Sequence, residues 1–219
     1  MVLTSGVHGP ELAPTELLVL NLVILSACFV LLCKPSFGNR KGVLILSAVT
    51  LLAASSRVIL EPFPNVQPLT VMCLIMGATL GARRGMAFAI MATILSNMVL
   101  SHGLWTLYQA SGWAIIAFVG SKANIIIDSK LNMKILLAYS VAASFLFDWW
   151  VSLSIITMET SLAEFMIYLL NGIPFDILHA VASIATALWL APHLVPLLDS
   201  EELDCNEITA HGEADVIIA

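Results

Sequence analysis

The sequence predicts an all-α membrane protein, and three observations support this prediction. Hydrophobic residues make up 59% of the 219 positions, charged residues make up 11%, and the mean hydropathy is +0.96. Soluble domains carry roughly 25% charged residues. The chain also contains several uncharged stretches close to the length of about 20 residues that a membrane-spanning helix needs. A chain of this length leaves no room for an additional large soluble domain.

Seven stretches are expected to form helices that cross the membrane. They are residues 16–33, 42–60, 67–82, 85–101, 106–121, 134–157 and 163–191. The first is expected to be an uncleaved helix, because residues 1–16 hold no Lys or Arg and a signal peptide has a basic start. The last is expected to begin with an interfacial piece and to span the membrane from about Ile173.

The basic residues orient these helices. Eight of the nine Lys and Arg residues fall in the first, third and fifth loops between the expected helices. Loops rich in Lys and Arg face the cytoplasm, so we expect residues 1–15 outside a plasma membrane and residues 198–219 inside it. The tail after Leu198 holds seven acids and no base, which predicts a disordered, solvated end.

Arg57 is the basic residue that departs from this rule. It lies about one helical turn from the outer end of its stretch, with Glu61 one turn further on. Its long side chain could snorkel and bring the guanidinium to the lipid headgroups. It could instead face inward, paired with an acid or binding an anionic group of a substrate, because arginine in the hydrocarbon core is costly. The sequence leaves both interpretations open.

Asp148 lies inside an apolar stretch, “SFLFDWWVSL”. An unpaired carboxylate at that depth is protonated or very costly. Arg57 is one candidate partner, because both residues lie toward the outer half of the expected bundle. A purely structural ion pair and a substrate-binding carboxylate remain alternatives.

The segment “PFDILHA” places Asp176 and His179 three residues apart, on one face of a helix. Pro174 suits the first turn of a helix and Asp176 suits its N-terminus, so capping explains Asp176 as well as ligand contact does. A lone His179 is more often a packed or hydrogen-bonded residue than a metal ligand. No second cluster has metal-site spacing, so no metal is expected.

The segment “HGLWTLYQASGW” concentrates aromatic residues, with Asn97 shortly before it. An interfacial aromatic belt explains Trp105. Gln109 and Trp113 follow Trp105 at four-residue spacing and form one helical stripe. This stripe could line a pocket for a ring-bearing solute, or it could pack against another helix.

Missing motifs exclude several classes of protein. The sequence contains no GxxxxGK[ST], so this chain does not bind ATP through a P-loop. It contains no GxSxG, and no serine has an evident base partner, so we do not expect an enzyme. Nothing in the sequence indicates a nucleic-acid binder.

From residue 57 to about 122 the pattern resembles the substrate-binding S components of energy-coupling factor (ECF) vitamin transporters. The matching pieces are “R…PFPNVQPLT”, “MGATLGARRG” and “ILSNMVLSHGLWTLYQASGWAIIAFVG”. The motif positions in them are Pro64, Pro68, Gly77, Gly81, Gly85, Gly103, Trp105, Thr106, Gln109 and Trp113. Gly81 and Gly85 also allow a tight turn between two short helices.

The resemblance implies a six-helix S-component-like bundle over residues 42–191, with residues 16–33 as one additional N-terminal transmembrane helix. It implies that the chain binds a vitamin or vitamin precursor from outside and docks on a transmembrane coupling subunit driven by two ATPase subunits. ATP would be used by those partners, and this chain would carry no cofactor. The family's docking motif AxxxA is not present, and Thr50 and Ala54 offer only a small-residue equivalent.

The resemblance also implies a binding site near the outer helix ends, beneath the loop “EPFPNVQP”. The expected substrate-binding residues are Arg57, Asn65, Gln67, Asn97, Trp105, Gln109, Trp113, Asp148, Asp176 and His179. The “GLWTLYQASGW” variety of the motif is similar to members thought to take up cobalamin or a related corrinoid, which is the expected substrate. Two alternatives remain: a stand-alone small secondary transporter, and a membrane-embedded enzyme that uses Asp176 and His179.

Overall fold

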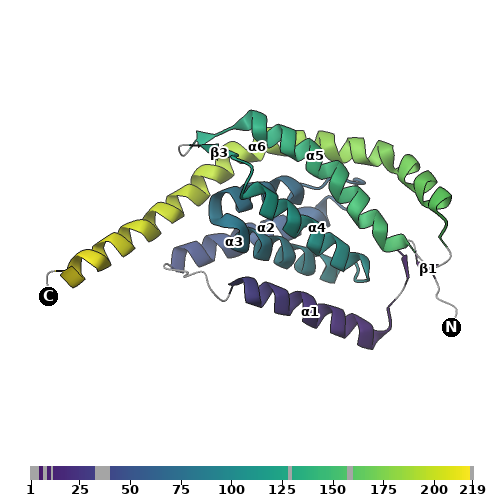
Figure 1. Cartoon of the computed structure of the whole chain (residues 1–219), viewed down its shortest axis with the longest axis horizontal. Helices are drawn as coiled ribbons and strands as arrows, with labels where there is room; N and C mark the ends of the chain where they lie inside the picture. Colours follow the sequence, from purple (N-terminus) through teal and green to yellow (C-terminus); the bar gives the residue numbers. More distant parts are fainter. Residues whose placement is uncertain are drawn as a thin grey trace.

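The computed structural model describes residues 5–6, 9–10, 12–32, 40–127, 130–156 and 160–217. These residues form helices and two antiparallel ladders of two-residue strands (Figure 1). In chain order the elements are β1 (Ser5–Gly6), β2 (Gly9–Pro10), α1 (Pro14–Leu32), α2 (Arg40–Ile59), α3 (Leu69–Leu100), α4 (Trp105–Gly120), β3 (Ile126–Ile127), β4 (Lys130–Leu131), α5 (Met133–Ser152), the 3₁₀ turn η1 (Leu153–Ile155) and α6 (Leu162–Ile217).

Five helices of the described chain are long and apolar enough to cross a membrane, namely α1, α2, α3, α5 and α6. The chain is therefore a multi-pass, all-α membrane protein, as its composition predicts. The expected division into seven stretches differs from the helices observed. Residues 67–82 and 85–101 fall largely within α3, and α4 has 16 residues, slightly fewer than the range of about 17–25 typical of a spanning helix.

A sharp turn at Gly81 divides α3 into two arms. Gly81 has φ 78° and ψ 168°, a backbone conformation that only glycine adopts readily. A Cβ atom placed on Gly85 would lie 2.8 Å from the Cα atom of Gly77, although eight residues of straight helix span about 12 Å. The chain therefore reverses at Gly81, and the turn expected between two short helices is confirmed.

The first arm of α3 forms the centre of the bundle. Every residue from Leu69 to Gly77 is buried, and α3 packs against all five other α-helices. A helix that is apolar on all sides must be surrounded by protein or lipid. Here the neighbouring helices surround it, and this arm contributes Leu69 and Val71–Met76 to a hydrophobic core that also contains residues of α2, α4, α5 and α6.

Two glycines bring α3 and α4 into backbone contact. A Cβ atom on Gly77 would lie 1.8 Å from the carbonyl oxygen of Ala117, and one on Gly120 would lie 2.3 Å from that of Leu74. Small residues permit such close approach in membrane proteins, where helix association depends on van der Waals packing rather than on the hydrophobic effect.

The additional N-terminal helix α1 packs against α3. The Cys28 thiol donates a hydrogen bond to the carbonyl oxygen of Ala87, with 3.7 Å between the sulfur and the oxygen. Arg83 donates to the carbonyl oxygens of Val30 and Leu31, at 2.7 and 3.2 Å. A basic side chain at a helix C-terminus satisfies carbonyl groups that lack a partner within the helix. Arg83 therefore anchors the end of α1 to the turn of α3.

The last helix, α6, is continuous from Leu162 to Ile217 and leaves the bundle at its C-terminal end (Figure 1). The interfacial piece expected before Ile173 is part of this helix, and Pro174 lies inside it. In a bilayer an interrupted backbone would expose unpaired polar groups, which favours one continuous helix. Residues 198–217 are also helical, whereas their composition predicts a disordered tail; Glu, Leu and Ala in this segment are good helix formers.

We predict that Gly77→Ala destabilises the protein by about 1–3 kcal/mol, because the added methyl group would overlap the carbonyl oxygen of Ala117 and force α3 and α4 apart. Thermal unfolding of the detergent-solubilised protein measures the effect. Gly172→Ala is the matched control, because a Cβ atom there would meet only Asp176 Oδ1, at 3.9 Å. Equal melting temperatures for the two variants would contradict the prediction.

Candidate functional site

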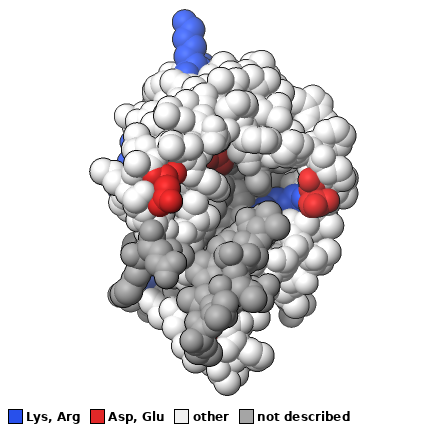
Figure 2. Space-filling view, turned by 90° about the vertical axis from the view of Figure 1, so that its right-hand side faces the viewer, with Lys and Arg blue, Asp and Glu red and all other residues white. Residues whose placement is uncertain are grey.

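A cavity of about 480 Å³ opens at the end of the bundle where α2 leads to α3, α3 to α4 and α5 to α6. Figure 2 shows a hollowed surface with acidic atoms deep inside the hollow and basic atoms in its wall beside another acidic group. Small-molecule sites commonly have volumes of about 300–1,000 Å³, so the cavity has the size of a ligand site. Six expected site residues line it: Asn65, Gln67, Trp105, Gln109, Asp148 and Asp176.

Three of the remaining expected residues lie behind the cavity wall: Trp113 and His179 are fully buried, and Asn97 is nearly so. Arg57 is also buried, but it lines a smaller neighbouring pocket of about 120 Å³ that shares Asn65 and Gln67 with the cavity. Trp105 and Gln109 of the predicted stripe face the cavity, whereas Trp113 stacks on Phe147 with 4.2 Å between ring centroids. The stripe therefore both lines a pocket and packs against α5.

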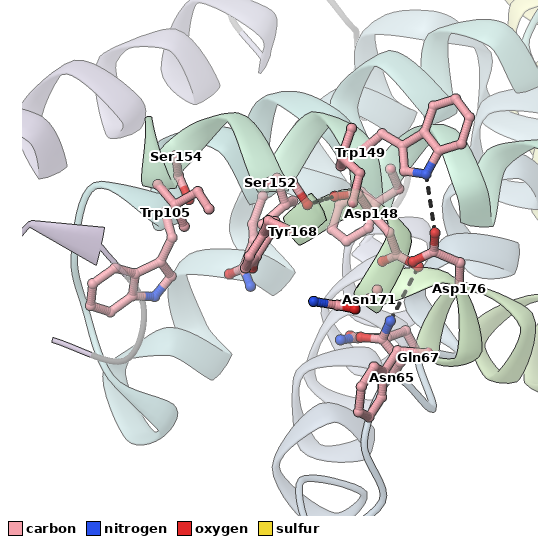
Figure 3. Close-up of a pocket in the computed structure, with 17 residues that line it drawn as sticks. Asn65, Gln67, Trp105, Asp148, Trp149, Ser152, Ser154, Tyr168, Asn171 and Asp176 are labelled. Atoms are coloured by element: carbon pink, nitrogen blue, oxygen red, sulfur yellow. Dashed lines mark hydrogen bonds between the residues drawn. The ribbon is translucent and has the colours of Figure 1, made fainter. Parts of the chain in front are cut away.

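The cavity also has lining residues that the sequence analysis did not select (Figure 3). They come from the end of α5, from η1 and from the first turns of α6. The polar and aromatic ones are Phe147, Trp149, Ser152, Ser154, Tyr168, Asn171 and Phe175. The spacing of Tyr168, Asn171 and Phe175 at three and four residues indicates one helix face. This spacing could have identified the face, but residues 163–172 are expected from the sequence to lie at the membrane interface rather than in the bundle.

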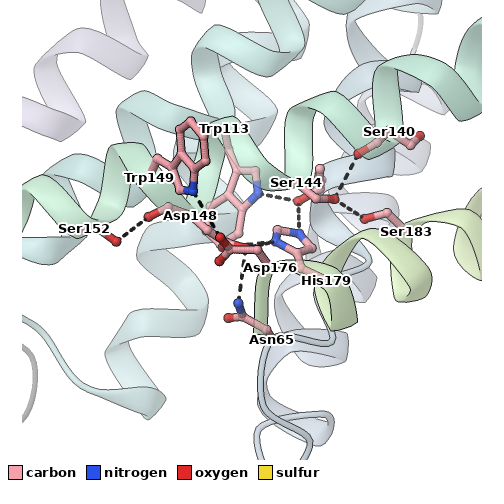
Figure 4. A network of polar contacts seen from close by, with 11 residues as sticks. Asn65, Trp113, Ser140, Ser144, Asp148, Trp149, Ser152, Asp176, His179 and Ser183 are labelled. Carbon is pink, nitrogen blue, oxygen red and sulfur yellow. Dashed lines mark hydrogen bonds and ion pairs between the residues drawn. The ribbon is translucent and has the colours of Figure 1, made fainter. Parts of the chain in front are cut away.

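Asp148 is at the centre of a polar network that joins four helices, α3 to α6, and the loop before α3 (Figure 4). Its carboxylate oxygens lie 2.9 and 3.1 Å from His179 Nδ1. The Asn65 amide donates to Asp148 Oδ2 at 3.2 Å. Asp176 lies next to it and accepts a hydrogen bond from Trp149 Nε1 at 3.0 Å. Asp148 is therefore held by a histidine and an amide.

His179 connects this carboxylate to the core of the bundle. Its Nε2 atom lies 2.8 Å from Thr70 Oγ1, and Trp113 Nε1 donates to the same hydroxyl oxygen at 3.1 Å. The edge of the His179 ring also packs against Phe147. Both ring nitrogens of His179 are thus engaged, which fixes the ring orientation. The expectation of a hydrogen-bonded histidine is confirmed.

The order Thr70, His179, Asp148 is that of a nucleophile, a base and an orienting acid. Thr70 is fully buried, and it is not among the residues that line the cavity. A molecule in the cavity would contact Asp148 rather than the hydroxyl group. The arrangement therefore orients the carboxylate toward the cavity and leaves the hydroxyl inside the core.

Asp176 does not cap a helix. It lies well inside α6, which begins at Leu162, so the capping interpretation is wrong. The continuous backbone across Pro174 removes the helix start on which that interpretation depended. Asp176 instead lines the cavity and is bonded to Trp149, which leaves ligand contact as the interpretation consistent with its position.

Arg57 faces inward and is only 6% exposed, so the snorkelling interpretation is wrong. Its Nη1 atom donates to Ser96 Oγ and to Asn97 Oδ1, the latter at 3.0 Å, and Nη2 donates to Gln109 Oε1 at 3.4 Å. The guanidinium also lies over the Trp113 ring, 4.5 Å from its centroid. A buried cation is stabilised here by neutral acceptors and an aromatic face.

Arg57 does not pair with an acid in the described part of the chain. The contact of this kind found there is between His179 Nδ1 and Asp148 Oδ2, 2.9 Å apart, which is an ion pair when His179 is protonated. The proposed pairing of Arg57 with Asp148 is therefore wrong, and Glu61 forms no ion pair with Arg57 either. The Arg57 guanidinium is bonded to side-chain oxygens on α3 and α4 instead, and the Asp148 carboxylate is bonded to His179.

The Arg57 network continues to the turn before α4. The Asn97 amide donates to Thr106 Oγ1 at 3.0 Å and to Gln109 Oε1 at 2.8 Å. Thr106 Oγ1 lies 3.4 Å from His102 Nδ1. Partial burial lowers the pKa of His102, which favours its neutral form at pH 7. Arg57 therefore carries the charge of this network.

Metal binding receives no support from the described residues. They contain no group of three or more His, Cys, Asp or Glu side chains placed to hold an ion. The arrangement of carboxylates, amides and aromatic rings around an open volume suits an organic molecule instead.

We predict that Thr70→Val destabilises the protein by about 1–3 kcal/mol, because it leaves Trp113 Nε1 and His179 Nε2 buried without a partner. Thr79→Val is the control, since the buried Thr79 hydroxyl bonds only to Ile75 of its own helix. Thermal unfolding of both variants in detergent measures the difference. Equal losses would show that the bonds to His179 and Trp113 contribute little.

A family model matches residues 37–195, from just before α2 to near the end of the apolar part of α6, Leu162–Leu198. The family is described as a family of unknown function, DUF6580. No curated protein and no solved structure matches the chain. Because the match spans well over half of its residues, the chain belongs to the DUF6580 family.

Proposed function

We propose that the chain is the membrane-embedded substrate-binding subunit of an ECF-type importer, which captures a vitamin or vitamin precursor from outside the cell. The observation that carries the proposal is the cavity of about 480 Å³. Its walls combine aromatic faces with carboxylate and amide groups, the mixture that orients a small organic ligand. Helix ends from distant parts of the sequence converge on it, as the resemblance implies.

The size of the cavity bears on the substrate. A volume of about 480 Å³ suits a compact, drug-sized molecule. Cobalamin or a related corrinoid is much larger and would have to extend out through the opening. A smaller ring-bearing vitamin or precursor is therefore favoured over the corrinoid that the “GLWTLYQASGW” motif suggests.

The proposal includes an orientation and partners. With the N-terminus outside and the C-terminus in the cytoplasm, the cavity opens to the outside of the plasma membrane, and Arg83 and Arg84 face the cytoplasm. Release inward would require the coupling subunit and two ATPase subunits. Thr50 and Ala54 are only 8% and 6% exposed, so the docking surface would lie elsewhere on the bundle.

Binding is favoured over catalysis because the Thr70 hydroxyl, the only nucleophile in the Thr70, His179, Asp148 arrangement, is buried where a ligand in the cavity cannot contact it. Thr70 is fully buried behind the cavity, and Ser152 in the cavity lining donates its hydroxyl to the backbone carbonyl oxygen of Asp148 rather than to His179. A stand-alone secondary transporter is the second candidate, favoured by one observation. The buried pair of Asp148 and His179 resembles the carboxylate and histidine groups of proton relays.

We predict that protein purified in mild detergent retains a small organic molecule that mass spectrometry can identify. The Gly172→Trp variant is expected to lose this bound molecule. A side chain at Gly172 would point toward Asp176 and grow into the cavity. Gly172→Ala adds one carbon atom and is expected to retain the ligand. An empty wild-type protein that also ignores a panel of vitamins would contradict the proposal.

We predict that uptake of the identified ligand requires the coupling subunit and both ATPases in the same membrane. In proteoliposomes, the complete complex is expected to import ligand only with ATP, and an ATPase variant unable to hydrolyse ATP is the control. Uptake by the isolated chain driven by a proton gradient would favour the stand-alone transporter instead.

A further inference from the structure

The cavity has acidic groups and no basic ones in its lining. Asp148 and Asp176 both line it, and the described lining residues contain no Lys or Arg. The two carboxyl groups lie side by side (Figures 3 and 4). Two like charges in a low-dielectric site repel each other, so the site favours a cation or a shared proton between them.

The cations nearest to the cavity are directed elsewhere. The Arg57 guanidinium is bonded to Ser96, Asn97 and Gln109, and Arg57 lines the smaller neighbouring pocket rather than the cavity itself. Glu61, an acid, lines that neighbouring pocket too. His179 contacts Asp148 through Nδ1 but is fully buried behind it. One histidine can offset at most one of the two carboxylates, so the other carboxyl group is neutralised either by a proton or by a cationic ligand that displaces that proton.

Aromatic side chains line the same cavity as the carboxyl groups. Trp105, Phe147, Trp149, Tyr168 and Phe175 line the same cavity, and Figure 3 shows the Trp149 indole beside Asp176. The faces of such rings attract organic cations, and several rings around one ammonium or similar group form a selective binding site. Carboxylates and rings thus favour the same ligand chemistry.

We propose that the substrate carries a positively charged, planar nitrogen group, such as an amidinium or aminopyridinium ring, that binds between Asp148 and Asp176. This inference rests on the proposed function, because it names the class of molecule that the transporter cavity takes. A metal ion fits less well, since the described residues hold no cluster of three ligands and a single ion would leave most of the volume unfilled.

Three probes of similar shape and different charge test the proposal: benzamidine, benzamide and benzoate. Ligand-observed NMR or calorimetry on the full-length protein in detergent gives their relative affinities. The expected result is that benzamidine binds at least about tenfold more tightly than neutral benzamide, a difference of about 1.4 kcal/mol, and that benzoate does not bind.

Asp176→Asn is expected to remove this preference. The asparagine keeps an oxygen to accept from Trp149 Nε1, so benzamide affinity and thermal stability should change little while benzamidine affinity falls about tenfold. Glu164→Gln is the matched control, because Glu164 is an exposed acid on the same helix that bonds only to Ser161.

Equal binding of benzamidine and benzamide, preferred binding of benzoate, or no binding of benzamidine would overturn the proposal. A co-purified ligand that is neutral or anionic would also overturn it and leave the importer function in place. Conversely, selective benzamidine binding by a chain that supports no uptake with ATPase partners would overturn the importer function and support the charge preference.

Discussion

The cavity depends on one buried chain of hydrogen bonds, from Thr70 through His179 to Asp148. These residues belong to α3, α6 and α5, and Trp113 adds α4 by donating to Thr70. In a bilayer a polar group that loses its partner cannot turn to water, so breaking these bonds destabilises the protein. This series of hydrogen bonds therefore fixes how the four helices are rotated and how far each is shifted along its axis, and so it fixes the floor of the cavity.

Arg57 affects the cavity indirectly, through amide groups. It donates to the side-chain oxygens of Asn97 and Gln109, and Asn97 donates to that same Gln109 oxygen. The Gln109 carbonyl is thus occupied, which leaves its NH₂ group as the part available to the cavity that Gln109 lines. The Arg57 guanidinium does not line the cavity, but by bonding to the Gln109 oxygen it determines which hydrogen bonds the cavity wall can offer.

The sequence indicates how deep a residue lies in the membrane, but it says much less about how each helix is rotated about its own axis. A polar residue in an apolar stretch is conspicuous, and so Asp148, Asp176 and His179 were identifiable. Their partners were not, because two residues at equal depth, such as Arg57 and Asp148, meet only if both helices turn the right face inward. Tyr168 and Asn171 were missed for a related reason: Pro174 suggested a helix start, whereas the chain continues through it.

The bundle divides its packing between two mechanisms. Away from the cavity, Gly77 and Gly120 bring α3 and α4 together through direct backbone contact, and Gly81 reverses the chain. Around the cavity the helices are held by hydrogen bonds between side chains instead. Backbone contact leaves no space for a ligand, whereas a polar network keeps helix ends apart at a fixed separation. An open, polar end can persist in this small protein because the glycine-packed half holds α3 and α4 together independently of it.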